Sequence, residues 1–325
     1  MILDIQTTYE RASPPFAPPS SERSEQEAAL LRTILYYDVF AYPLRVEEML
    51  QFVAIAGIGK EEAEEALWEM RREKIIDCCD GYWFVAARGS AIVERRRAME
   101  TEGERMWRIA RRIGGVMKRV PFVRGVFISG QLCHYVADAE SDIDYFVVTA
   151  PGRLWIARTL MVLFRRTILL NNRKYFCVNY FVSEENLTVR ERNLYVACET
   201  VSAKPLWNRE LYAEFARRNR WVRNYYPAFD IDAAELRAGV PEGRSSLQRL
   251  LERLIPAEWA DALDTRLMEM TRRFWRRKFP DRDPELYAVH LRCEPDESRA
   301  HPSDVGAEIL RRYRAGLSAH GLSEA

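Results

Sequence analysis

The chain has 325 residues, of which 48% are hydrophobic and 30% are charged, and its formal net charge is +1. This length is enough for two or three domains with a substantial core, and the composition is typical of a soluble globular protein. A net charge close to zero excludes a general electrostatic attraction to nucleic acid or to an acidic membrane, so such a contact would need a local patch.

The cysteines and the apolar segments predict a cytoplasmic protein that does not enter a membrane. The six cysteines form no CxxC pair, and most lie in apolar stretches, which is typical of reduced thiols in a protein core. Residues 1–6 lack the basic and apolar regions of a signal peptide. The longest apolar run, 154–170, is interrupted by three arginines, whereas a membrane span needs about 20 predominantly apolar residues.

The N-terminal part predicts a disordered leader followed by a small domain. Residues 1–22 are rich in proline and serine and show no sustained period. Residues 23–90 predict three helices and then two short strands joined by Asp80-Gly81, a pair that favours a tight hairpin turn. This order resembles a winged-helix domain. The third helix, 60–73, is acidic over most of its length and would be repelled by DNA, so protein docking is favoured over duplex binding.

Residues 91–120 predict a basic helical connector. The wider segment 88–124 holds eleven Lys or Arg residues against four Glu. It is either a solvated helix that bridges two domains or a rim that attracts a polyphosphate or a nucleic-acid acceptor. A solvated helix is favoured, because runs of charge usually face water.

The stretch 125–148 carries the pattern with the clearest chemistry. The apolar run 125–129 predicts a buried strand, Gly130 ends it, and a short helix and a polar loop lead to a second strand that starts at Asp142. Side chains two apart on a strand share a face, so Asp142 and Asp144 lie on one side, about 7 Å apart along the strand. Such a pair can hold one Mg²⁺ ion or bridge two. Like charges at the edge of an apolar strand are costly without a cation, which favours a binding site.

This motif resembles the signature of the polymerase-beta-like nucleotidyltransferase superfamily, in which a strand, a Gly-Ser pair, a short helix and a loop precede Asp-x-Asp on the next strand. Asp142 follows Gly130 by twelve positions, which matches that signature. The resemblance implies an α+β core over residues 121–205 with a small mixed sheet, Mg²⁺ as cofactor and an NTP as substrate. It implies that Asp142 and Asp144 are the catalytic residues and hold the metal. It also implies a triphosphate site at Ser129, Gly130, Gln131 and Ser141.

Two features depart from this signature. Gln131 replaces the serine that follows the glycine; its amide can donate to phosphate but is bulkier. The third carboxylate of the family is missing from the later strand, 175–182, whose only strongly polar residue is Asn179. The amide oxygen of Asn179 can coordinate Mg²⁺ without adding charge, and Asn179 is therefore the predicted third ligand. Glu184 and Glu185, just beyond that strand, are the alternatives.

Other polar residues near the motif are candidates for nucleotide contacts. Arg153, Arg158 or Lys174 could reach a phosphate, although a surface charge or a structural ion pair is the commoner role of such residues. His134 could contact the nucleotide, but an ordinary polar residue on a short helix is favoured.

Residues 206–325 predict a helical C-terminal region, with helices over 206–217, 247–254 and 257–278. The last helix ends in a basic and aromatic cluster, 272–278, in which Trp275 could stack on a base. The favoured alternative is a helix end whose cations complement the helix dipole and whose aromatic residues face the core.

The sequence thus predicts a Mg²⁺-dependent enzyme that transfers an NMP from an NTP to an acceptor hydroxyl on a small molecule, an RNA or a protein. It does not identify the general base, which is normally a third carboxylate. Two alternatives stay open. One is a catalytically impaired protein that senses nucleotides or docks a partner, which Asn179 favours. The other is a winged-helix regulator that binds DNA.

Overall fold

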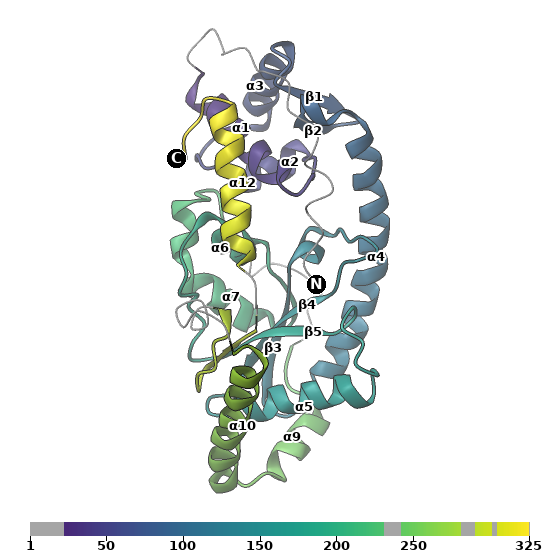
Figure 1. Cartoon of the computed structure of the whole chain (residues 1–325), viewed down its shortest axis with the longest axis vertical. Helices are drawn as coiled ribbons and strands as arrows, with labels where there is room; N and C mark the ends of the chain where they lie inside the picture. The colour runs from purple at the N-terminus through teal and green to yellow at the C-terminus, as the bar shows by residue number, and fades with distance from the viewer. Residues whose placement is uncertain (1–22, 231–241, 281–289, 301–303, 325) are drawn as a thin grey trace.

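The structure, a computed structural model, describes residues 23–230, 242–280, 290–300 and 304–324 (Figure 1). The predicted leader, 1–22, lies outside the described residues. The fold is α+β, as predicted, and its described part forms ten α-helices, a five-stranded mixed sheet and a two-stranded hairpin.

Three helices and a hairpin form the N-terminal domain, in the predicted order. Ser24 starts the first helix with a capping box, in which its hydroxyl accepts from the Glu27 N–H and the Glu27 carboxylate accepts from the Ser24 N–H. The hairpin turns at Asp80 and Gly81, whose positive φ angles of 52° and 79° fit a tight two-residue turn. The elements are α1 (Glu25–Asp38), α2 (Val46–Phe52), α3 (Lys60–Arg72), β1 (Ile76–Cys79) and β2 (Tyr82–Val85).

The predicted basic connector is one helix, α4 (Ala91–Met117), which runs along one side of the molecule from the N-terminal domain down to the sheet (Figure 1). Arg96, on this helix, is 4% exposed. Its guanidinium bonds to Glu48 at 2.8 Å and to Glu100 at 2.9 Å, and it lies 3.7 Å from the centre of the Tyr42 ring. Arg96 therefore ties α4 to the N-terminal domain.

Removal of the Arg96 guanidinium is expected to destabilise the fold. Arg96→Ala leaves Glu48 and Glu100 without their cation, and it should lower the free energy of unfolding by about 3 kcal/mol in a denaturant titration. Arg97→Ala is the matched control, because it breaks an exposed pair with Asp80 and should cost less than about 1 kcal/mol. Equal losses in the two variants would contradict the structural role of Arg96.

The five-stranded sheet has the order β6-β3-β4-β5-β7, in which β4 and β5 are parallel and the other neighbours are antiparallel. One face shares a hydrophobic core with the N-terminal domain and with α6, α7 and α12, and the other face packs against α4, α5 and α10. The strands are β3 (Val123–Ser129), β4 (Asp144–Thr149), β5 (Cys177–Ser183), β6 (Lys204–Trp207) and β7 (Glu297–Arg299). The N-terminal domain and the sheet are thus joined by one continuous core.

Two strands come from segments that the sequence predicts as helical. Residues 204–207 form the edge strand β6, although a helix is predicted to begin at residue 206, and β7 lies inside the predicted helical region. Asn208 separates β6 from the next helix, because its side chain accepts from the Leu211 N–H and donates to the Arg124 carbonyl on β3. β7 has three residues, which are too few for a period-two pattern to show in the sequence.

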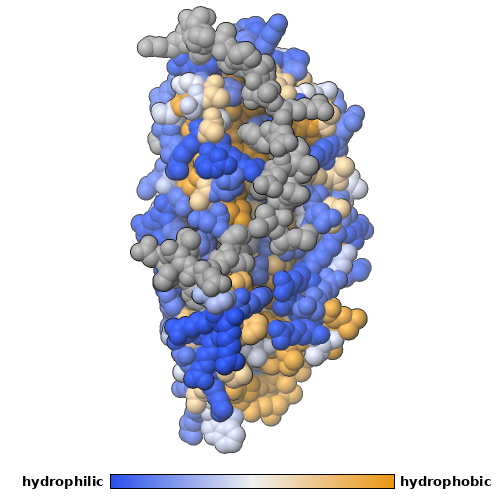
Figure 2. Space-filling model, viewed as in Figure 1, coloured by the Kyte–Doolittle hydropathy of each residue, from blue (hydrophilic) through white to orange (hydrophobic). Residues whose placement is uncertain are grey.

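The remaining helices complete the two layers around the sheet. They are α5 (Leu154–Thr167), α6 (Leu194–Ser202), α7 (Arg209–Arg218), α9 (Ser246–Arg253), α10 (Ala257–Lys278) and α12 (Val305–Ala319), with the short 3-10 helices η2 (Ala86–Arg88), η3 (Gln131–His134) and η4 (Arg220–Asn224). None of the described helices combines the length and the apolar composition of a membrane span. The visible surface is mostly hydrophilic, and apolar side chains gather at its lower end (Figure 2).

The two aromatic residues in the basic cluster at the end of α10 differ in burial: Trp275 packs in the core as predicted, whereas Phe274 is 51% exposed. Trp275 is 5% exposed and belongs to the core on the α5 side of the sheet. The Arg158 guanidinium lies 5.2 Å from its ring centre. Because its ring is buried, Trp275 does not present a platform on which a base could stack.

Candidate functional site

Three chain segments meet at one edge of the sheet. Because β4 and β5 are parallel, their first residues lie at the same edge, and Asp144 is the register partner of Cys177. β3 is antiparallel to β4, so its last residue, Ser129, pairs with Asp144 at that edge as well. Asp142 lies on the loop that leads into β4. The topology thus gathers the end of β3, the Asp-x-Asp segment and the start of β5.

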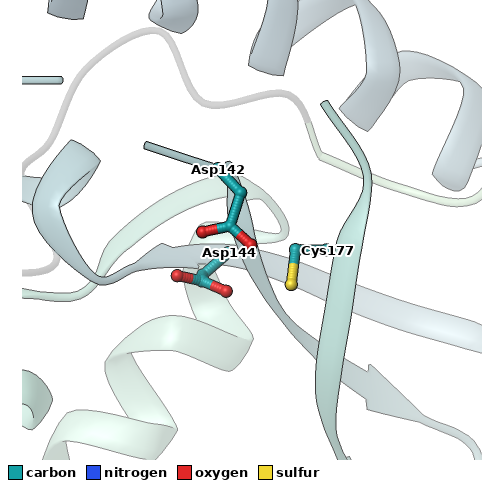
Figure 3. Close-up of side chains that lie close together, drawn as sticks. All are labelled: Asp142, Asp144 and Cys177. Atoms are coloured by element: carbon teal, nitrogen blue, oxygen red, sulfur yellow. The ribbon is translucent and has the colours of Figure 1, made fainter. Parts of the chain in front are cut away.

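Asp142, Asp144 and Cys177 point toward one another at this edge (Figure 3). One carboxylate oxygen of each aspartate and the Cys177 Sγ all lie within 4.8 Å of one another. Asp144 shares its face of β4 with Phe146, which belongs to the core next to the N-terminal domain. The structure therefore brings together the two carboxylates that the sequence places on one face, and it adds a thiol.

The backbone of Gly130 lies close to the Asp144 carboxylate. Its φ of 67° is a conformation that residues with a side chain rarely adopt. A Cβ atom at this position would lie 2.8 Å from the Asp144 Oδ2, which is too close for a stable contact. Any larger residue at 130 would displace the Asp144 carboxylate.

The surroundings of the Asp144 carboxylate disfavour its charged form. Burial raises the pKa of Asp144 from an ordinary 3.8 to about 7, and the neighbouring charge of Asp142 is the next largest cause. A hydrogen bond with Cys177 lowers this pKa in part, and the charge of Glu199 raises it further. Neither Asp142 nor Asp144 forms an ion pair with another residue in the described part of the chain. A cation at this point would offset both burial and the charge of Asp142, because it favours the charged form of the carboxylate.

Glu199 is a third carboxylate at the site and is absent from the site residues predicted from the sequence. It lies on α6, and its Oε2 accepts a hydrogen bond from the Gly130 N–H at 3.4 Å. Burial raises the pKa of Glu199, although the Gly130 N–H lowers it in part. The signal in the sequence is that Glu199 is the single charged residue within Leu194–Ser202, an otherwise apolar and neutral helix.

Cys177 joins Asp142 and Asp144 in a group of side chains that could hold a metal ion. The side-chain Nδ2 of Asn179 donates to the Cys177 Sγ at 2.7 Å, so Asn179 contacts the sulfur. Asn179 is the predicted third ligand because it is the strongly polar oxygen donor on β5, and the cysteines are predicted to lie in the core. The parallel pairing of Asp144 with Cys177, which the sequence does not reveal, brings the Cys177 thiol to the carboxylate pair.

Gln131 and Ser141 organise the loop that precedes Asp142. The Ser141 hydroxyl lies within hydrogen-bonding distance of Gln131 Oε1, at 2.7 Å, and of Asp138 Oδ1, at 2.8 Å. The Lys174 ammonium donates to the Ala139 carbonyl of the same loop at 2.7 Å. These hydrogen bonds hold the loop that leads into β4 in place.

Four predicted candidates lie away from the carboxylate pair. Arg153 lies beyond the far end of β4, where it pairs with Asp261. Arg158 is on α5, on the opposite face of the sheet, against the Trp155 and Trp275 rings. Glu184 and Glu185 follow the last residue of β5, at the sheet edge opposite Cys177. Strand residues rise about 3.3 Å each, so the seven-residue β5 separates them from the site.

His134 packs between the sheet edge and the N-terminal domain. Its ring centre lies 5.7–5.8 Å from the ring centres of Tyr37, Tyr42 and Phe52. Burial, with the charges of Lys204 and Arg96, lowers the pKa of His134 to about 3, so the ring is neutral at physiological pH. This setting agrees with the structural role that the sequence favours.

Comparisons of the chain with protein-family models, with curated proteins and with solved structures found no match.

Proposed function

We propose that this chain is a metal-dependent nucleotidyltransferase, which transfers an NMP from an NTP to an acceptor hydroxyl and releases pyrophosphate. One observation carries the proposal: Asp142 and Asp144 face each other at a sheet edge with no ion-pair partner among the described residues, beside Gly130. A divalent cation is the partner that such a pair lacks. A glycine backbone also allows a phosphate to come close.

The side chains at this edge fit a divalent cation. Asp142 and Asp144 supply oxygen ligands within reach of one ion, and the resemblance implies Mg²⁺. A bound cation would neutralise the charge that develops on the phosphate oxygens during transfer. The carboxylate pair would hold it next to the backbone of Gly130.

The proposed reaction is an in-line displacement at the α-phosphorus. The acceptor oxygen forms a bond to this phosphorus while the bond to the oxygen that bridges the α- and β-phosphates breaks, and pyrophosphate leaves with the electron pair. The proton of the acceptor hydroxyl needs a base. Glu199 supports this role, because its carboxylate contacts Gly130 and burial moves its pKa toward the neutral range in which bases work best.

A transfer assay tests the proposal. The wild-type chain would be incubated with each of the four NTPs, labelled at the α-phosphate, with MgCl₂ and three acceptor classes: an RNA with a free 3′ hydroxyl, an aminoglycoside and the chain itself. We expect label on at least one acceptor and stoichiometric pyrophosphate, with neither product from the Asp142→Asn/Asp144→Asn variant. No transfer under any condition, together with NTP affinity unaffected by Mg²⁺ or by that variant, would exclude the enzyme and favour a nucleotide-sensing protein.

A further inference from the structure

Cys177 differs from every other cysteine of the chain in its surroundings. Cys133 and Cys293 belong to the hydrophobic core on the α5 side of the sheet, and Cys198 belongs to the core on the other side. Cys78 and Cys79 are partly buried, and each packs against a hydrophobic cluster. Cys177 is as buried as Cys293, at 7% against 8% exposed, yet it is part of none of these clusters. Cys177 is thus buried outside the hydrophobic clusters that the other cysteines join or contact.

The groups around the Cys177 sulfur are polar and suit a metal ligand. Two carboxylates lie within 4.8 Å on one side. The Asn179 amide donates to the sulfur and orients it. An outer hydrogen bond of this kind commonly supports ligands in metal sites. The sulfur is thus positioned by β5 and directed at the carboxylate pair.

We infer that Cys177 is a metal ligand and that, with Asp142 and Asp144, it forms a site for a divalent transition metal such as Mn²⁺, Co²⁺ or Zn²⁺. The inference rests on the same carboxylate pair as the proposed function and names the ion that the pair takes. Ligand atoms around one tetrahedral ion lie about 3.5 Å apart, so rotations of about 1 Å at the side-chain ends bring this group to bonding distance. Three protein ligands leave one position open for substrate, as in catalytic zinc sites.

The sulfur changes the expected order of metal affinities. Mg²⁺ prefers oxygen ligands in octahedral geometry, whereas a thiolate favours softer ions such as Zn²⁺. On binding, the Cys177 thiol gives its proton to solvent and the sulfur forms a bond to the metal, with no change in oxidation state. The site therefore binds Zn²⁺ and Co²⁺ more tightly than Mg²⁺, and binding of the softer ions releases a proton.

Cobalt spectroscopy and metal titrations test this inference on the full chain in reducing buffer. The variants are Cys177→Ser and, as a matched control, Cys293→Ser, which replaces an equally buried thiol on the opposite side of the sheet. We expect a near-ultraviolet thiolate-to-Co²⁺ charge-transfer band in the wild type and in Cys293→Ser but not in Cys177→Ser. We expect Zn²⁺ affinity to fall at least about tenfold in Cys177→Ser while Mg²⁺ affinity changes less than about threefold. Thermal unfolding shows that each variant is folded.

The possible outcomes separate this inference from the proposed function. Co²⁺ binding without the band, or equal Zn²⁺ affinity of Cys177→Ser and wild type, overturns the thiolate ligand and leaves nucleotidyl transfer open. The expected band with no transfer from any NTP, when the assay is repeated with Mn²⁺, Co²⁺ and Zn²⁺ as well as Mg²⁺, supports the metal site and overturns the proposed reaction. A wild type that binds none of these ions overturns the metal site itself.

Discussion

Asp144→Asn is expected to abolish nucleotidyl transfer while it stabilises the metal-free protein at neutral and alkaline pH. Loss of a carboxylate ligand removes transition-state stabilisation of about 4 kcal/mol, which corresponds to a rate loss of about a thousandfold. The same substitution removes a buried negative charge whose pKa is raised by burial and by Asp142. Activity and stability should therefore change in opposite directions, which a simple folding defect cannot produce.

The pH dependence of stability follows from the raised pKa of Asp144. Between an ordinary pKa of 3.8 and the folded-state value of about 7, the folded protein holds a proton that the unfolded chain has released. Stability of the metal-free wild type should therefore fall as pH rises from about 4 to 7 and stay low above that range. Asp144→Asn should lack this part of the decline.

Thermal unfolding in a metal chelator at pH 5 and at pH 8 measures this effect. We expect the melting temperature of Asp144→Asn to exceed that of the wild type by about 2–4 °C at pH 8 and to match it more closely at pH 5. Asp80→Asn, in the exposed hairpin turn, is the control and should change neither activity nor this difference. A wild type more stable than Asp144→Asn at pH 8 without metal would contradict the buried-charge argument.

The sequence is a good guide to the elements whose signals are local. The hairpin turn at Asp80-Gly81 and the order of strand, Gly130, short helix and second strand each depend on neighbouring residues, and both form as predicted, although the second strand begins at Asp144 rather than at Asp142. The edge strand β6 is less accessible to such reasoning. Its four residues precede a helix with apolar residues of its own, and its pairing with β3 is a contact across about 80 positions.

The residues of the candidate site also differ in whether a local signal in the sequence predicts them. Asp142 and Asp144 are recognised because they are two residues apart in one local motif, although β4 begins only at Asp144 and Asp142 lies on the loop before it. Cys177 and Glu199 reach the site through tertiary structure, the first by parallel pairing of β5 with β4 and the second by the packing of α6 onto the sheet. Arg153 and Arg158 are close to the motif in sequence, but β4 and α5 carry them to the far edge and the opposite face. Distance along the chain is therefore a weak guide to membership of this site.

Glu199→Gln is expected to reduce transfer by about 10²–10⁴-fold, the usual contribution of a general base. The amide oxygen of glutamine can still accept from the Gly130 N–H, so the local fold and the affinities for NTP and metal should stay within about threefold of wild type. Because the base works only when deprotonated, the wild-type rate should rise with pH through the raised pKa of Glu199 and then level off. The variant should lose this rise.

Initial rates at saturating NTP between pH 5 and pH 9 distinguish a base from a merely structural residue. Glu210→Gln, at an exposed position on α7, is the matched control and should keep the wild-type rate and pH profile. Glu199→Asp, which retains the carboxylate on a shorter side chain, should recover part of the rate together with the dependence on pH. If Glu199→Gln lowered the rate equally at every pH and Glu199→Asp recovered nothing, the residue would position Gly130 rather than accept the proton. The contact between Glu199 and Gly130 is compatible with a general base and with a residue that only positions Gly130. The pH profile of the rate distinguishes the two roles.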